Sequence, residues 1–270
     1  MKLFLIFCFS VLFPCLVWPQ SEGLSTAYGA KSQGMGGVKL FHPDSWTLFN
    51  SIGNLDRVSS SQVAVGIDQR FGIKELSTYA LSHVFHQTKG SLGYGISRYG
   101  GELFNQHLLS LGGATTKGIL NFGAKAEWMQ TRIEGFGTGN AFLLSLGGVA
   151  ELGPKFFLGS QISNLTQARI SKNSSISLPT SILLGLKYLA SPEVEIHSEV
   201  EKELSTPPLF KAGVQYKLGE WLLLRTGMQS NPARINFGLG IRKSSFGADY
   251  AYGQTSALGR SHHMSLYLEF

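Results

Sequence analysis

The chain of 270 residues has few cysteines, few charges and only one long apolar run. Its two cysteines, Cys8 and Cys15, lie within the first 20 residues, so a chain processed after that segment would have no thiol for a disulfide, a nucleophile or a metal site. Only 15% of the residues are charged, and the formal net charge of +6 is spread along the chain. The absence of a basic tract argues against a nucleic-acid-binding surface, so no nucleic acid is expected as a partner.

The single apolar run, residues 3–17, follows Lys2 and precedes Trp18-Pro19. A basic start followed by about 15 apolar residues is typical of a secretory signal peptide, which we assign to residues 1–19. A lipoprotein signal around Cys15 is the alternative, but Leu12 and Phe13 are bulky where a lipobox has small residues. No second run approaches the length of about 18 apolar residues that a spanning helix needs, which excludes a helical inner-membrane protein.

Glycine is abundant, with 33 residues, and from residue 62 onward the sequence alternates between apolar and polar positions. In residues 234–242, for example, Ile235, Phe237 and Leu239 alternate with polar residues and glycine. This period of two, interrupted by turn residues, predicts β-strands. Low charge with many short alternating strands is typical of a membrane-spanning barrel that is apolar outside and polar inside.

The alternating runs predict about 14 strands within residues 62–270, and therefore an all-β fold, a transmembrane antiparallel β-barrel. An even number is expected for a single-chain bacterial barrel. The predicted strands are 62–71, 75–87, 91–99, 103–114, 119–131, 141–151, 156–168, 176–189, 193–203, 209–218, 221–229, 234–243, 247–254 and 262–270.

Charged side chains recur on one face of these strands. Such faces would be unstable in a dry core, so we expect them to line a wet lumen and to pair across it. The candidates are Lys125, Glu127, Glu195, Glu199, Lys211, Lys217, Arg225, Arg234, Arg242 and Asp249. Expected pairs join Glu127 to Lys125 and Asp249 to Arg225 or Arg242, with Glu195, Glu199 and Glu201 reaching Lys211, Lys217 and Arg225.

The chain ends on an alternating strand in which Met264, Leu266, Leu268 and Phe270 share one face. A terminal phenylalanine on a final strand is typical of outer-membrane barrels, where it forms part of the assembly signal. We therefore expect the protein in the outer membrane of a Gram-negative bacterium, with membrane lipid and the barrel-assembly machinery as partners. A soluble β-sandwich, with the charged faces outside, is the alternative fold.

Residues 20–61 precede the barrel and do not alternate. About forty residues without a period are long for an idle segment. We expect this segment to fold into the lumen or across its periplasmic mouth as a plug; the alternative is a partly ordered periplasmic leader.

Residues 30–55 resemble the amino-terminal signature of the PorV/PorQ group of outer-membrane proteins, relatives of the FadL transporters. Seven residues match it: Gly34, Met35, Gly36, Gly37, Asp44, Asn50 and Gly53. Ser51 and Ile52 stand where the group usually has proline and alanine. Segments 161–165, 178–188 and 223–270 are also similar to the group.

The resemblance implies a plugged, non-enzymatic barrel of 14 strands that acts in type IX protein secretion or in surface attachment of secreted proteins. Its partners would be secreted client proteins or secretion-system subunits. The alternative function is FadL-like transport of hydrophobic small molecules, with a strand kinked near Gly93–Gly95 or Gly112–Gly113 that opens sideways. A structural barrel without transport is a third possibility.

No residue pattern predicts catalysis, a cofactor or a metal site. His83 and His86 are three residues apart, which places them on opposite faces of a strand. The adjacent residues His262 and His263 also point to opposite faces, so neither pair is expected to bind a metal ion together. Glu195 and Glu199 with His197 resemble an acid–base group, but ion pairs within the lumen explain them better.

Overall fold

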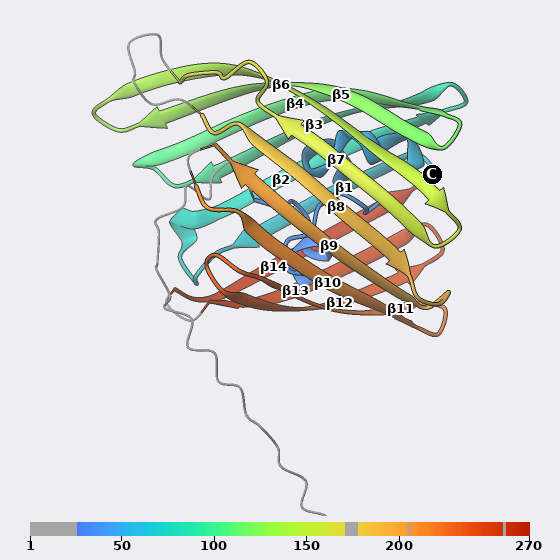
Figure 1. Cartoon of the computed structure of the whole chain (residues 1–270). Coiled ribbons are helices and arrows are strands. Elements are labelled where there is room, and N and C mark those ends of the chain that lie inside the picture. The colour runs from blue at the N-terminus through green and yellow to red at the C-terminus, as the bar shows by residue number, and fades with distance from the viewer. Residues whose placement is uncertain (1–25, 171–177, 205, 256–257) are drawn as a thin grey trace, which may run out of the picture.

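The computed structural model describes residues 26–170, 178–204, 206–255 and 258–270. Its strands form one closed antiparallel barrel in which each strand pairs with the next in sequence and β14 pairs with β1 (Figure 1). This confirms the predicted fold class, including the count of 14 strands among the described residues. The expected signal peptide, residues 1–19, lies outside the described residues.

The strands vary in length, and those from β4 to β6 are the longest. Their bounds are β1 Gln62–Gln69, β2 Ser77–Gln87, β3 Gly90–Gly100, β4 Phe104–Lys117, β5 Leu120–Ile133, β6 Gly137–Gly153, β7 Phe156–Ser163, β8 Ser181–Leu189, β9 Val194–Glu203, β10 Leu209–Leu218, β11 Leu222–Gln229, β12 Arg234–Lys243, β13 Phe246–Thr255 and β14 Gly259–Glu269. A short 3-10 helix, η2 (Lys74–Leu76), lies between β1 and β2.

The alternation seen in the sequence separates the two faces of the wall. On β12, Ile235 and Phe237 are more than half exposed on the outer face, whereas Arg234 and Asn236 are buried on the lumen face. The outer face is therefore an apolar belt around the barrel, as a bilayer requires, and the chain is an outer-membrane barrel as expected. Separately, none of the helices among the described residues is long and apolar enough to span a membrane.

The two ends of the barrel differ in their connections. At the end that holds Phe270, whose amide donates to the carbonyl of Ser61 (3.0 Å), tight turns such as 244–245 join the strands. The opposite end carries the longest connections, 70–76 and 164–180. Short periplasmic turns and longer extracellular loops are the rule for such barrels, so the Phe270 end corresponds to the periplasmic side.

Two predicted strands are shorter than expected. The predictions of 156–168 and 176–189 are wrong beyond Ser163 and before Ser181; residues 176 and 177 lie outside the described residues. Asn164 has a positive φ of 56°, which a strand does not accept. Its amide Nδ2 donates to the carbonyl of Leu178 (3.0 Å) and its Oδ1 accepts from the amide of Ala168 (3.0 Å), so the chain folds back on itself here.

The glycines expected to kink the wall do not do so. Pairing runs without a shift through Gly93 and Gly95 on β3 and through Gly112 and Gly113 on β4. The described wall has its one register shift between Glu151 and Gly153. The strand glycines serve a different purpose, which the contents of the lumen explain.

Candidate functional site: the plugged lumen

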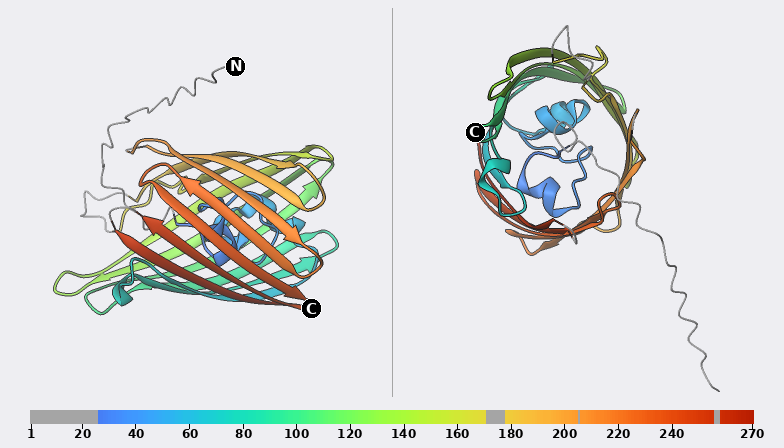
Figure 2. Two further views of the ribbon diagram at one scale, coloured as in Figure 1. Left: turned by 90° about the horizontal axis from the view of Figure 1, so that it is seen from below. Right: turned by 90° about the vertical axis from the view of Figure 1, so that its left-hand side faces the viewer.

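The segment before β1 fills the lumen. It forms two short helices, α2 (Ala30–Gly34) and α3 (Thr47–Asn50), and a 3-10 helix, η1 (Ile52–Arg57), all inside the ring of strands (Figure 2). Within residues 29–55, only Pro43 is exposed. We call residues 26–61 the plug. It starts near Arg70 and Tyr99, at the end away from Phe270, and descends to β1.

Asn50 closes the plug on itself. Its Oδ1 accepts from the amide of Tyr28 (2.7 Å), and its Nδ2 donates to the carbonyl of Tyr28 (2.8 Å) and to Ser32 Oγ (3.2 Å). The Asn50 side chain therefore joins α3 to α2 and to Tyr28, in the first residues of the plug. Gln161 on β7 holds the same region to the wall, because its Nε2 donates to the Asn50 carbonyl (2.9 Å).

The Gly34–Gly37 turn lies backbone against backbone on the wall. A Cβ atom on Gly227 of β11 would be 2.1 Å from the carbonyl carbon of Met35, and one on Gly213 of β10 would be 2.5 Å from the Met35 oxygen. Gly36 and Gly37 have φ of 76° and 80°, which side-chain-bearing residues rarely adopt. Only glycine on both surfaces permits this approach.

The same device recurs around the barrel. Gly53 of the plug meets Gly148 of β6, where a Cβ would be 2.4 Å from a backbone nitrogen, and Gly34 meets Gly238 of β12. Other lumen-facing glycines accommodate plug side chains or backbone: Gly66 for Trp46, Gly95 for Phe49, Gly112 and Gly123 for Ile52, Gly159 for Phe41 and Gly185 for Leu40. Much of the glycine content of the strands thus makes room for the plug.

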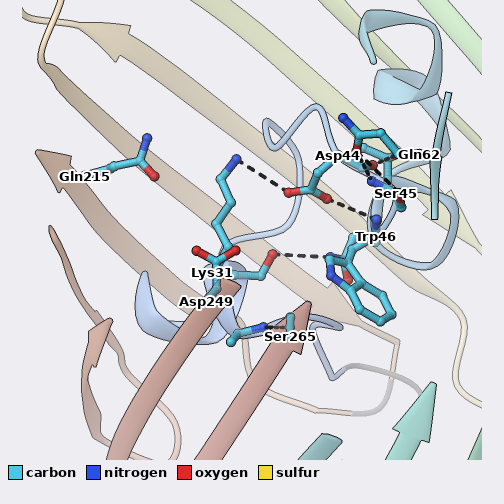
Figure 3. A network of polar contacts seen from close by, with 12 residues as sticks. Lys31, Asp44, Ser45, Trp46, Gln62, Gln215, Asp249 and Ser265 are labelled. Carbon is cyan, nitrogen blue, oxygen red and sulfur yellow. Dashed lines mark hydrogen bonds and ion pairs between the residues drawn. The ribbon is translucent and has the colours of Figure 1, made fainter. Parts of the chain in front are cut away.

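Asp44 is buried and links two parts of the plug, as Figure 3 shows. Its carboxylate lies 3.5 Å from Lys31 Nζ and accepts from the amide of Trp46 (3.0 Å). Burial raises the pKa of Asp44 and lowers the pKa of Lys31 to about 8, and in both cases the partner's charge acts in the opposite direction. Nearby Ser45 donates from its amide to Gln62 at the start of β1 (3.2 Å).

Acidic residues of β9 bind the plug directly. Glu199 accepts from the amides of Lys39 (2.8 Å) and Leu40 (2.6 Å). Glu201 lies between two ammonium groups, Lys39 Nζ at 2.8 Å and Lys211 Nζ at 2.5 Å. We expected Glu199 to pair with a cation of a neighbouring strand. Its carboxylate instead accepts hydrogen bonds from the plug backbone.

Two further predicted lumen pairs are present. Lys125 Nζ lies 2.9 Å from Glu127 and also donates to the carbonyl of Phe49 in the plug (2.7 Å). Arg225 lies 2.6 Å from Asp249 and donates to Gln215 (2.7 Å). These charges are satisfied within the protein, so the lumen is not a wet, open channel lined by free charges.

The remaining candidates lie away from the plug contacts. Glu195 pairs with Lys187 (3.2 Å), not with the cations we expected. Arg234 donates to Thr255 (3.2 Å), and Lys217 is exposed near its strand end. Arg242 has its guanidinium carbon 5.7 Å from the Tyr267 ring centroid. Register decides these partners, and sequence does not specify register.

Several residues of the plugged lumen were not among the sequence candidates. They include Lys31, Lys39, His42 and Gln161, which carry no pattern in the sequence. Glu201, by contrast, was expected to pair with Lys211 and does so. Within the part of the chain that the structure describes, no three His, Cys, Asp or Glu side chains are grouped to hold a metal ion.

An apolar patch interrupts the polar lumen at the end away from Phe270. It consists of Met129, Ala141, Leu143 and Leu178, with Leu108, Ala168 and Ile170 packed against it. Two small cavities adjoin it, of about 20 and 50 Å³, and both are lined by Thr26, Tyr28 and Leu108. Segments 164–170 and 178–180 of the β7–β8 connection cover the patch.

No family model and no curated protein matches the sequence. Among solved structures, the CymD monoaromatic hydrocarbon channel shares 14% identity at a TM-score of 0.73, covering 92% of this chain and 98% of that chain. The Ralstonia pickettii toluene transporter TbuX shares 12% at 0.72, covering 92% and 100%. A Pseudomonas aeruginosa FadL homologue shares 12% at 0.61, covering 90% and 98%.

At these identities the similarity shows the fold alone, which this chain shares with outer-membrane barrels described as hydrocarbon channels and transporters. The prediction of a PorV/PorQ-type protein acting in type IX secretion is wrong, because the structural neighbours are hydrocarbon channels and a FadL homologue. The matched signature residues explain the error in physical terms. Gly36, Gly53 and Asn50 pack and close a plug, which a barrel with a filled lumen needs whatever it carries.

Proposed function

We propose that this barrel carries small hydrophobic molecules across the outer membrane. The proposal combines the fold shared with hydrocarbon channels and transporters with one feature of this chain, the apolar patch in the lumen. The function is transport, and no step requires catalysis.

The apolar patch carries the proposal. Other apolar lumen side chains, such as Val149, Phe157 and Leu183, pack against Leu40 and Phe41 of the plug. The patch differs because Met129, Ala141 and Leu143, on two adjacent strands, group with Leu178 and not with a plug residue. Apolar side chains at such positions offer a hydrophobic solute a place outside water, which is favourable in proportion to the area covered. Leu178 and Ile170 complete the patch from the β7–β8 connection.

The structure shows a closed state. Cavities of about 20 and 50 Å³ are far below the roughly 300 Å³ at which small-molecule sites begin. Both cavities touch Thr26 and Tyr28, so displacement of this plug entry would join them beside the patch. Transport therefore requires the plug, or the segment over it, to move.

The test is uptake of radiolabelled toluene by Gram-negative cells that produce the protein. Leu143→Asn places an amide in the patch and should reduce protein-dependent uptake by about tenfold, since burying an unpaired amide beside an apolar solute costs on the order of 1–3 kcal/mol. Leu143→Met keeps the site apolar and should retain uptake within about twofold.

Both variants must first show a folded barrel, by heat-modifiable mobility of the unboiled protein on a denaturing gel. Equal uptake by cells with and without the protein would refute the proposed function. Full uptake by a folded Leu143→Asn barrel would show that the transported molecule does not pass the apolar patch.

A further inference from the structure

The lipid-facing surface has a large hollow. It has a volume of about 990 Å³ and lies over the outer faces of β12–β14 and β1–β5. Its lining is mainly apolar and includes Ile67, Leu81, Ile96, Leu109 and Met264. Tyr79, Trp128 and Tyr250 add aromatic rings to it.

Behind the hollow, the wall packs closely on the plug. Gly66 of β1 has no side chain, and a Cβ there would be 3.0 Å from the Trp46 ring of the plug. On the next strand, Ser265 Oγ accepts directly from the amide of Ala30 in the plug (2.7 Å). Short side chains on β1 and β14 thus let the plug approach this part of the wall closely.

Two basic residues, one on β3 and one on β4, lie in the mainly apolar lining of the hollow. Arg98 of β3 and His107 of β4 are direct cross-strand neighbours, and Tyr79 of β2 is opposite Arg98. Arg98 alternates with Ile96 and is exposed on the same outer face. Both lie in the half of the barrel away from Phe270, and within the described chain neither has an acidic partner.

The outer face of the described strands offers no carboxylate at all. Every acidic residue in these strands points to the lumen: Asp68, Glu127, Glu151, Glu195, Glu199, Glu201, Glu203, Asp249 and Glu269. A second copy of the barrel therefore has no strand carboxylate to offer Arg98. Along the lipid-facing wall itself, a lipid headgroup is the source of negative charge that this surface lacks.

An arginine facing lipid is unfavourable unless it reaches the interface or finds an anion. A phosphate group supplies that anion, because it accepts several charge-assisted hydrogen bonds from a guanidinium, and the His107 ring beside Arg98 offers a further hydrogen-bonding nitrogen. We propose that the hollow binds one phosphorylated membrane lipid, its acyl chains on the apolar wall and its phosphate at Arg98 and His107.

Trp128 lines the hollow and reports on its occupant. Trp221 is also exposed, so Trp221→Phe serves as the parent protein, in which buried Trp46 supplies a constant background. The parent is reconstituted in phosphatidylcholine vesicles containing brominated phosphatidylglycerol or brominated phosphatidylcholine, whose bromines quench tryptophan on contact. Half-maximal quenching should need about tenfold less brominated phosphatidylglycerol, the ratio that one charge-assisted hydrogen bond provides.

Adding Arg98→Gln and His107→Gln to the parent should remove the preference and leave equal quenching by the two lipids. Arg132→Gln is the matched control: it removes an outward arginine of β5 that lies outside the hollow, and the preference should persist. Excess inorganic phosphate should not abolish it, since a free ion has no acyl chains to bind the apolar wall and therefore competes weakly with the lipid. Equal quenching in the parent, or a preference that survives loss of Arg98 and His107, would overturn the proposal.

Discussion

At the scale of the residue, glycine and asparagine decide how the lumen is filled. The wall glycines do not kink the strands. They lie where the plug approaches so closely that a Cβ atom would clash with it, as at Gly227 and Gly213. Asn50 then fixes the plug to itself with three hydrogen bonds. The sequence predicted that these plug residues matter but not the wall glycines opposite them, because that pairing depends on tertiary register.

Gly227→Ala should loosen the plug. Its Cβ would lie 2.1 Å from the carbonyl carbon of Met35. Overpacking of this kind typically destabilises the packed state by about 1–3 kcal/mol. Hydrogen exchange of plug amides should accelerate while strand amides stay protected. Gly153→Ala is the control, since nothing lies within 4 Å of a Cβ there; equal plug protection in the two variants would show that the contact does not matter.

Asn50→Ala should expose the plug to protease. It leaves the buried amide and carbonyl of Tyr28 without their partner, at a cost of about 1–3 kcal/mol for each unsatisfied group. Limited proteolysis of the detergent-solubilised protein should then cut within residues 20–61 faster than in the parent chain. Unchanged cleavage would mean that Asn50 does not hold the plug.

His42 should make the plug less stable in acid. Burial holds the pKa of His42 well below its usual value, with the charge of Lys31 acting in the same direction, and neither ring nitrogen has a hydrogen-bond partner. The released plug therefore binds a proton below about pH 6.5 that the docked plug does not. Docking should weaken by up to about 1.4 kcal/mol per pH unit below 6.5.

The measurement is hydrogen exchange of plug amides at pH 7.0 and 5.5, corrected for intrinsic rates. His42→Gln should show a smaller loss of protection on acidification than the parent. His86→Gln, which changes a histidine at the exposed end of β2, should behave as the parent does. An identical loss in His42→Gln would assign the acid sensitivity to other groups.

At the scale of the element, strands and plug differ in how far sequence predicts them. Alternation located all 14 strands, because one face must meet lipid and the other the lumen. It failed at residues 164–168 and 178–180, where Asn164 turns the chain by hydrogen bonds that have no period. Alternation also could not predict that the carboxylates of β9 bind plug backbone. A carboxylate on a strand face fits the same sequence pattern whether its partner is a lysine or a backbone amide.

Glu199 tests the link between plug and wall. Glu199→Gln keeps the size of the side chain but replaces a carboxylate that accepts from two plug amides, and hydrogen bonds to a charged acceptor are worth about 1.5–3 kcal/mol. The plug should become more protease-sensitive than in Glu151→Gln, because Glu151 is half-exposed and forms a weaker pair with Arg57. Equal sensitivity would exclude Glu199 as an anchor.

At the scale of the whole molecule, the protein consists of a closed barrel wall and a plug that fills its lumen. Closure of β14 on β1 leaves no free sheet edge, and the plug is held mainly by side-chain contacts, ion pairs and close glycine packing. The apolar patch is sealed in this state, so the proposed passage of a hydrophobic molecule depends on plug movement within an intact wall.

Locking the plug to the wall tests this account most directly. The hydrogen bond from the Ala30 amide to Ser265 Oγ (2.7 Å) limits the separation of the two Cα atoms to under about 6.8 Å, within disulfide range. Both native cysteines lie in the expected signal peptide. Toluene uptake by the Ala30→Cys/Ser265→Cys protein should be lost in the oxidised state and return on reduction. Undiminished uptake through the oxidised, fully cross-linked barrel would contradict the account.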